Sequence, residues 1–205
     1  PEENIQTEQP VQAPACTPKK FDNTYSYVYN TQDECKIGGN LAFMDEEITW
    51  SNVPEKATVY EHLQRAIDFS MNHLGPHGLP AGLHADWNDC LRLGAQGESS
   101  FVAMQLYYAF SIMRLFAQKK NDTDYIAYLD KTQKEIGDKI NELWWEDDRF
   151  NRGFKDTGEL IGSKKDPEAS MWLNPQSWAV ISGLATKEQA EKALESVDRE
   201  LNTAY

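Results

Sequence analysis

The sequence predicts an all-α fold built from helices of two kinds. From residue 36 onward, apolar residues recur at the three-to-four-residue spacing of a helix. Residues 98–119 are apolar on nearly every side, whereas the neighbouring segments carry a single apolar stripe. A helix that is apolar all round is buried on all sides. This alternation is typical of two concentric helical layers, because a simple four-helix bundle would give every helix a similar stripe.

The first predicted helix spans residues 58–74. Thr58 has the side chain of an N-cap residue, and Glu61 lies three residues later, where a capping-box partner is expected. The dipeptide Gly75-Pro76 then ends the helix. The following residues, 78–97, are rich in Gly, Pro, Asp and Asn, so we expect a long loop. The apolar stripe of the helix consists of Tyr60, Leu63, Ile67, Met71 and Leu74.

Two long helices are predicted next, over residues 98–119 and 122–145. The first leaves almost no polar face, so it is expected in the interior. We therefore expect residues 98–119 to be far more buried than residues 122–143. The second helix has lysines and a glutamate opposite a single apolar stripe, formed by Tyr125, Leu129, Thr132, Ile136, Ile140 and Leu143.

The last part of the chain predicts two shorter helical segments. Residues 175–182 form a short apolar segment that Gly183 ends. Thr186 then caps an amphipathic helix that continues through Glu200. Its apolar face is expected to consist of Ala190, Leu194, Val197 and Leu201.

Residues 1–35 differ from the rest of the chain. They are rich in Pro, Gln, Thr and Asn and show no sustained periodicity, which is typical of an irregular tail or linker. We therefore place one helical domain in residues 36–205. The chain has no initiator methionine and stops at Tyr205, directly after a helical pattern, so we expect it to be a piece of a longer protein.

The composition restricts the partners of the chain. Of 205 residues, 33 are Asp or Glu and 20 are Lys or Arg, which gives a net charge of −13. No Lys/Arg cluster is present to neutralise phosphates, so binding to nucleic acid or to an anionic membrane surface is not expected. No apolar run approaches the roughly 20 residues that span a bilayer. Cys16, Cys35 and Cys90 lack metal-binding spacing, and such sparse thiols are typical of a reduced, cytoplasmic protein without a metal site.

The predicted loop contains the most informative string, Gly82-Leu83-His84-Ala85-Asp86-Trp87-Asn88-Asp89-Cys90. Trp87 offers a flat apolar face for the C–H surface of a pyranose ring, and Asn88 can both donate to and accept from hydroxyl groups. A carboxyl group shielded beside an indole has its neutral form favoured, as a general acid at neutral pH requires. Asp86, Trp87, Asn88 and Asp89 are therefore candidates for a sugar-binding site.

A purely structural interpretation of the same string stays open on the residues alone. Asp86, Asn88 and Asp89 are also common loop residues, because their side chains form Asx-turns and cap helices. The other candidates are weaker, since a lone loop histidine is more often hydrogen-bonded or exposed, and tryptophans at a helix end more often pack in the core. These weaker candidates are His77, His84, the pair Trp144-Trp145, and the polar–aromatic group Glu168, Trp172, Asn174 and Gln176.

A family resemblance favours the functional interpretation. Nearly all of residues 36–205 resembles the disaccharide phosphorylases of glycoside hydrolase family 94. The similarity is closest to the cellobiose-cleaving members, with the chitobiose and laminaribiose phosphorylases close behind. The Asp-Trp-Asn-Asp string with its flanks is specific, whereas a bare Asp-Trp would not be. The stretches that carry the resemblance are residues 39–43, 57–62, 75–80, 84–91, 97–99 and 172–183.

The resemblance implies an (α/α)6 toroid, the six-hairpin barrel, with residues 36–205 as a segment of its catalytic domain. It implies that Asp89 is the general acid and that Trp87 contacts the sugar, with Asp86 and Asn88 beside it in the substrate site. The implied reaction is inverting phosphorolysis of a β-linked, cellobiose-like disaccharide to an α-sugar 1-phosphate and a free sugar. Inorganic phosphate would be the co-substrate, with no cofactor. Phosphate is already an anionic nucleophile, so Asp89 needs no partner base, whereas an inverting hydrolase needs a second carboxylate to activate water.

Parts of the family pattern are not seen in residues 1–205. The N-terminal β-sandwich and the early barrel helices would come before the resembling region, and the phosphate-binding part would follow Tyr205. We therefore expect the chain alone to be inactive, and the full-length form is compatible with a homodimer. Two alternatives remain, an inverting hydrolase on a similar toroid and a non-catalytic helical scaffold. Dependence on phosphate separates the phosphorylase from the hydrolase, and complete inactivity supports the scaffold.

Overall fold

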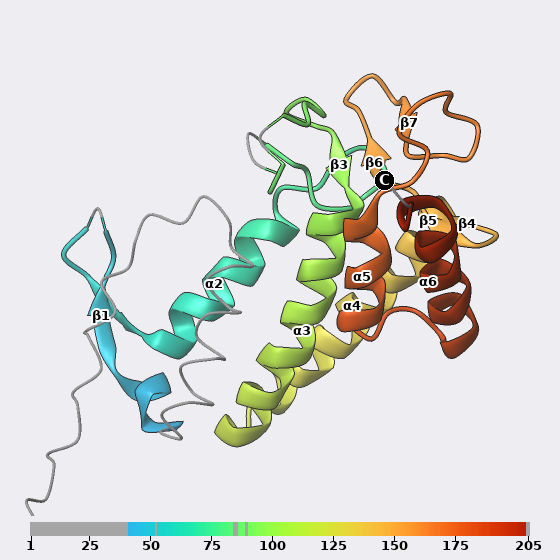
Figure 1. The fold of residues 1–205 in the computed structure, drawn as a ribbon. Coiled ribbons are helices and arrows are strands. Elements are labelled where there is room, and N and C mark those ends of the chain that lie inside the picture. The colour runs from blue at the N-terminus through green and yellow to red at the C-terminus, as the bar shows by residue number, and fades with distance from the viewer. Residues whose placement is uncertain (1–40, 52, 84–85, 89, 204–205) are drawn as a thin grey trace, which may run out of the picture.

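The computed structural model describes residues 41–203 apart from residues 52, 84–85 and 89. This part of the chain is predominantly helical, as predicted (Figure 1). The predicted tail, residues 1–35, lies outside the described residues. The helical elements are η1 (Leu41–Asp45), α2 (Val59–Met71), α3 (Ser100–Lys120), α4 (Thr123–Trp144), α5 (Leu173–Ile181) and α6 (Lys187–Leu201). Helix α3 contacts α2, α4 and α5, and α6 packs on α5.

The N-terminal caps of α2 and α6 form as predicted. Glu61 N donates to Thr58 Oγ1 at 3.2 Å, and Thr58 N donates to Glu61 Oε2 at 2.7 Å, which closes the capping box of α2. Thr186 and Gln189 form the same reciprocal pair at the start of α6. Helix α2 ends at Met71, somewhat before the predicted end, and the chain then turns back on itself.

The predicted contrast between α3 and α4 is confirmed. Helix α3 is buried on several sides along most of its length, whereas α4 buries a single stripe that ends in the fully buried Trp144. An all-round apolar helix is most stable between other elements. By length and composition α3 is also apolar enough to cross a membrane, unlike the expectation from the sequence. That is weak evidence of a membrane span, because buried core helices meet the same criterion and most of α3 is buried here.

Short strands connect the helices, so the all-α prediction is corrected to a mainly helical fold. Strands of two or three residues are too short to show an alternating pattern in the sequence. All their pairings in the described part of the chain are antiparallel. The paired strands are β1 (Glu47–Thr49) with β2 (Lys56–Thr58), β4 (Trp145–Glu146) with β5 (Arg149–Phe150), and β6 (Gly153–Phe154) between β3 (Glu98–Ser99) and β7 (Leu160–Ile161).

The contact between β3 and β6 depends on Gly153. Its φ is +150°, and a Cβ there would lie 2.2 Å from the Glu98 carbonyl oxygen. No L-residue fits that space without moving β3. Ser99 pairs with Gly153, so the residues just before α3 lie beside residues 152–154, far along the chain. This pairing positions the candidate site.

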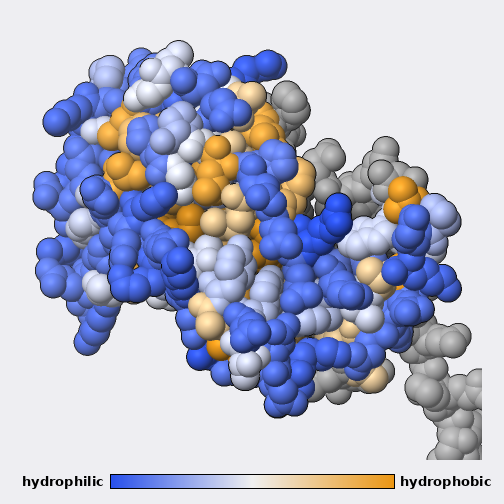
Figure 2. All heavy atoms as spheres, turned by 180° about the vertical axis from the view of Figure 1, so that it is seen from behind, coloured by the Kyte–Doolittle hydropathy of each residue, from blue (hydrophilic) through white to orange (hydrophobic). Residues whose placement is uncertain are grey.

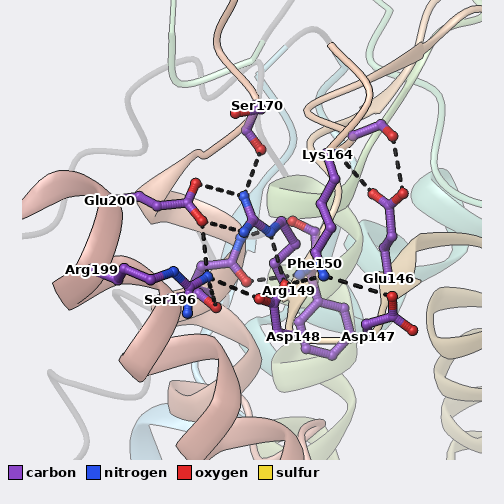
Figure 3. A network of polar contacts seen from close by, with 12 residues as sticks. Glu146, Asp147, Asp148, Arg149, Phe150, Lys164, Ser170, Ser196, Arg199 and Glu200 are labelled. Atoms are coloured by element: carbon purple, nitrogen blue, oxygen red, sulfur yellow. Dashed lines mark hydrogen bonds and ion pairs between the residues drawn. The ribbon is translucent and has the colours of Figure 1, made fainter. Parts of the chain in front are cut away.

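The predicted apolar face of α6 is wrong in part, because Ala190 and Val197 are half-buried as expected but the two leucines are not. The buried residues of α6 are Ala193 and Ser196, whereas Leu194 and Leu201 are 47% and 44% exposed. The small side chains let α6 lie close to α5 and β5. Polar contacts with the β4–β5 hairpin add to this packing, as Figure 3 shows. An apolar pattern alone does not reveal such a polar attachment.

Several large apolar side chains remain exposed. Leu173, Val180 and Ile181 lie on one face of α5, because they are seven and eight residues apart, and all three are exposed. The view from behind in Figure 2 shows apolar side chains gathered within a largely hydrophilic surface. Scattered exposed apolar residues are normal in proteins, so these residues are not by themselves evidence of a binding site.

Candidate active site

Asp86 is the anchor of the predicted sugar-binding loop. Its side chain is only 4% exposed. Oδ2 accepts a hydrogen bond from Ser99 Oγ at 2.6 Å, and Oδ1 accepts one from Arg152 Nη2 at 2.5 Å. Asp86 Oδ1 also accepts from the backbone N–H of Asn88 at 3.0 Å. Both carboxylate oxygens are therefore engaged by protein donors.

Ser99 connects this loop to the start of α3. Its hydroxyl donates to Asp86 and accepts from Arg152 Nη1 at 2.7 Å. It also accepts from the backbone N–H of Val102 at 3.3 Å, which makes Ser99 the N-cap of α3. One hydroxyl thus serves the carboxylate, the guanidinium and the helix terminus together.

Arg152 lies inside the protein, with its side chain 1% exposed. Its guanidinium carbon is 5.9 Å from the ring centre of Phe101 and 5.5 Å from that of Trp172, within the range of cation–π attraction. Nη1 and Nη2 have partners in Ser99 and Asp86, while Nε has none among the described residues. Such a buried charge requires a partner, and removing one side of a buried ion pair costs about 3–5 kcal/mol.

Trp87 and Asn88 follow the anchor directly. Trp87 is 71% exposed, so its indole is accessible to a ligand. Asn88 Oδ1 accepts from the backbone N–H of Cys90 at 3.0 Å. The contacts of Asp86 and Asn88 are the Asx-turns of the structural interpretation, and they coexist with an exposed indole between them.

Asp89, the predicted general acid, lies outside the described residues, as does His84. The turn at residues 86–88 leads directly into Asp89, and Cys90 follows it. The assignments of Asp89 as general acid and of Asp86, Trp87 and Asn88 as substrate-binding residues remain predictions. The burial of Asp86 favours a role in shaping the loop.

Glu98 holds the first part of the same long loop. It is completely buried, and its Oε1 accepts from the backbone N–H groups of His77 and Leu79, each at 3.0 Å. The ring Nδ1 of His77 lies 2.5 Å from Glu98 Oε2. His77 also stacks on Phe154, with ring centres 4.2 Å apart. Glu98 and Ser99 are therefore consecutive residues that hold two segments of one loop.

Three of the other candidates, Trp144, Trp172 and Gln176, make contacts within the fold, whereas Glu168 is exposed. Trp144 is fully buried, as the core interpretation expects. Gln176 is buried too, and its amide both accepts from the Phe150 N–H and donates to the Phe150 carbonyl at 2.8 Å. Trp172 Nε1 donates to the Ala169 carbonyl. In the described part of the chain, no three His, Cys, Asp or Glu residues come together as a metal site.

Sequence reasoning did not identify Arg152 or Glu98 as parts of the site. Charged residues are usually exposed, so a single Arg or Glu carries no sign that it is buried. The one available signal is their setting: Arg152 lies in the aromatic-flanked string Phe150-Asn151-Arg152-Gly153-Phe154. The signal for Glu98 is its place directly before an all-round apolar helix.

Comparison with known proteins decides the family. Residues 8–205 match the sequence model of the Glycosyl hydrolase 94 superfamily, catalytic domain. The chain belongs to this superfamily. The match begins at residue 8 and so includes most of the segment that the sequence alone predicted as a tail.

Relatives of this family 94 chain include disaccharide phosphorylases. It is 35% identical over 176 residues to an N,N'-diacetylchitobiose phosphorylase of Vibrio proteolyticus, covering 82% of this chain and 21% of that protein. It is 33% identical over 174 residues to a solabiose phosphorylase of Paenibacillus borealis, covering 83% of this chain and 22% of that protein. The chain thus spans about a fifth of the length of these relatives.

A solved structure shares the arrangement of the elements. A rhamnosidase from Klebsiella oxytoca with rhamnose bound aligns with a TM-score of 0.50 at 10% identity, covering 86% of this chain and 28% of that chain. At such low identity the similarity concerns the fold alone.

Proposed function

We propose that the protein to which these residues belong performs phosphorolysis of a β-linked disaccharide, with Asp89 as the general acid. The observation that carries the proposal is the anchored turn: a buried Asp86 holds the backbone that presents the exposed Trp87 and leads into Asp89. Relatives that are named disaccharide phosphorylases align over more than four fifths of the chain, which supports the same reaction class.

The proposed reaction is a single displacement at the anomeric carbon. An oxygen of inorganic phosphate forms a bond to this carbon while the bond to the leaving sugar oxygen breaks. Asp89 gives its proton to that oxygen, and the products are an α-sugar 1-phosphate and a free sugar. The configuration inverts because attack and departure occur on opposite faces of the ring. Phosphate brings its own negative charge, so no second carboxylate is needed to activate a nucleophile.

Several finer points belong to the same proposal. The substrate is cellobiose-like, and phosphate is the co-substrate without a further cofactor. The phosphate site and the rest of an (α/α)6 toroid are supplied by parts of the protein beyond this chain. We place the protein in the cytoplasm, because its few cysteines are typical of a protein with reduced thiols. A homodimer is compatible with the full-length form. The chain alone is inactive in this proposal.

The test is phosphate dependence in a family 94 chain of full length that contains residues 1–205. Cellobiose and N,N'-diacetylchitobiose are incubated with and without inorganic phosphate, and sugar 1-phosphate and free sugar are measured. The proposal expects equal amounts of both products, and none without phosphate. Two free sugars formed without phosphate would instead identify a hydrolase, and an inverted anomeric configuration of the first-formed sugar would make it an inverting one. No turnover of either disaccharide, in a folded protein, would favour the non-catalytic scaffold.

A further inference from the structure

We propose that Arg152 is a positioning residue for the proposed general acid, acting through Asp86. Arg152 and Asp86 are 66 positions apart in the sequence, yet their side chains meet at 2.5 Å in the interior. Asp89 lies three residues after Asp86, so whatever fixes Asp86 also fixes the start of the segment that carries the acid. The inference rests on the proposed function.

Asp86 makes the turn through one carboxylate oxygen. Its Oδ1 accepts from Arg152 Nη2 and from the Asn88 N–H at the same time. The position of this oxygen therefore decides where the Asn88 backbone lies. Because Ser99 engages the other oxygen, the carboxylate plane cannot rotate without losing a contact to Arg152 or to Ser99.

Arg152 is itself held by contacts of its backbone and its side chain. Its backbone carbonyl accepts from Ser100 N at 3.1 Å and from Ser100 Oγ at 2.8 Å. Its backbone N–H donates to the Ile161 carbonyl at 2.7 Å. The guanidinium lies near the rings of Phe101 and Trp172. Arg152 is thus fixed at both ends to the first turn of α3 and its small sheet.

The two contacts of the side chain require an arginine at position 152. The guanidinium is a rigid fork that donates to Asp86 and Ser99 with two different nitrogens. A lysine keeps the charge but has a single ammonium group on a flexible stem, so it cannot reproduce both directions. A general acid must lie close to the leaving oxygen, and a displacement of about 1 Å can cost on the order of 10²-fold in rate.

The experiment compares Arg152→Lys with Arg149→Lys in the full-length protein. Arg149 is a matched control, because it is also buried and ion-paired but its partners are Asp148 and Glu200. We expect Arg152→Lys to lower kcat about 10–10²-fold with a much smaller change in KM, and Arg149→Lys to leave both nearly unchanged. On a substrate with an activated leaving group, which needs little protonation, the loss for Arg152→Lys should largely disappear.

A second measurement does not depend on activity. Hydrogen–deuterium exchange at the Asn88 and Cys90 amides should accelerate at least tenfold in Arg152→Lys and stay unchanged in Arg149→Lys. Normal exchange at these amides would overturn the proposal, as would an equal loss of kcat on both substrates. If the parent protein has no phosphorolytic activity, the proposed function fails, and the exchange comparison still decides whether Arg152 holds the turn.

Discussion

Arg149 and Glu200 form a two-pronged ion pair that joins the β4–β5 hairpin to the last helix. Nη1 of Arg149 donates to Glu200 Oε2 at 2.7 Å, and Nη2 donates to Oε1 (Figure 3). Asp148 lies beside the same guanidinium, whose Nε donates to its Oδ1 at 3.0 Å. Arg199 and Lys164 also contact Asp148, and these donors lower its pKa against the opposing effect of burial. Polar contacts thus attach the end of α6, where the prediction expected Leu201 to be buried.

Replacing Glu200 by Gln should lower the free energy of unfolding by about 1–2 kcal/mol at neutral pH, because a charge-assisted pair with a buried arginine is lost. The hydrogen bond from Arg149 lowers the pKa of Glu200 from its usual 4.5. A carboxyl group with a lowered folded pKa stabilises the fold above its unfolded pKa, and this contribution is lost as pH falls through the folded value. The difference in Tm between the two proteins should therefore shrink below about pH 4.5. Glu188→Gln, in an exposed pair with Lys192, is the control and should leave Tm unchanged.

Asp89→Asn should reduce kcat of the full-length protein by roughly 10²–10⁴-fold, because the amide cannot supply the proton that the leaving oxygen needs. Sugar affinity should change much less. On a substrate with an activated leaving group, which needs little protonation, the kcat of Asp89→Asn should be partly restored. Asp86→Asn is the companion variant, and steady-state kinetics of both separate the two carboxylates. Near-normal turnover of Asp89→Asn together with an inactive Asp86→Asn would mean that the general acid has been assigned wrongly.

Trp87→Ala should weaken sugar binding while leaving stability intact, because the indole is 71% exposed and supports no core contact in the described structure. Trp144→Ala is the opposite case: this side chain is fully buried, and its removal should cost about 3–5 kcal/mol. Urea unfolding measures the stability of both variants, and KM of the full-length protein reports sugar binding. A large loss of stability in Trp87→Ala would show that the indole packs rather than binds.

Glu98→Gln should loosen the first part of the loop. A neutral amide oxygen accepts from the His77 and Leu79 N–H groups more weakly than a carboxylate, and the amide nitrogen that would face His77 Nδ1 can only donate, so the charge-assisted contact with this ring is lost. We expect a loss of about 2–3 kcal/mol in unfolding free energy and faster amide exchange at both residues. Glu159→Gln, from an exposed pair with Lys155, is the control. Equal unfolding free energies and equal amide exchange rates in Glu98→Gln and Glu159→Gln would contradict the role given to Glu98.

The helices could largely be predicted from sequence, because their signals are local. Thr58 and Glu61 are three residues apart, and a capping box needs nothing beyond those positions. The burial of α3 followed from its own composition in the same way. The short strands β3 and β6 could not be predicted, because each has only two residues and its partner lies about 55 positions away.

The candidate site was predictable only in part, for the same reason. The string around Asp86 and Trp87 is contiguous and chemically distinctive, so it could be found. Arg152 could not, because its importance depends on a contact between distant segments and its residue type favours the surface. The face of α6 was predicted only in part, because Glu200 and Arg149, rather than Leu194 and Leu201, make the attachment.

The close approach of Gly153 to Glu98 has a consequence for the order of folding. The loop that carries the candidate site lies before α3 in the chain, but the residue that holds it, Arg152, follows α4. Contacts between such distant segments form late, since the intervening chain must first be closed into a loop. We therefore expect a newly made chain to form its α3–α4 hairpin first and to order the turn at residues 86–88 only once the strand beginning at Gly153 has docked. Synthesis would have to proceed past Ile161, which holds the Arg152 backbone, before this turn in the first half of the chain could be fixed in place.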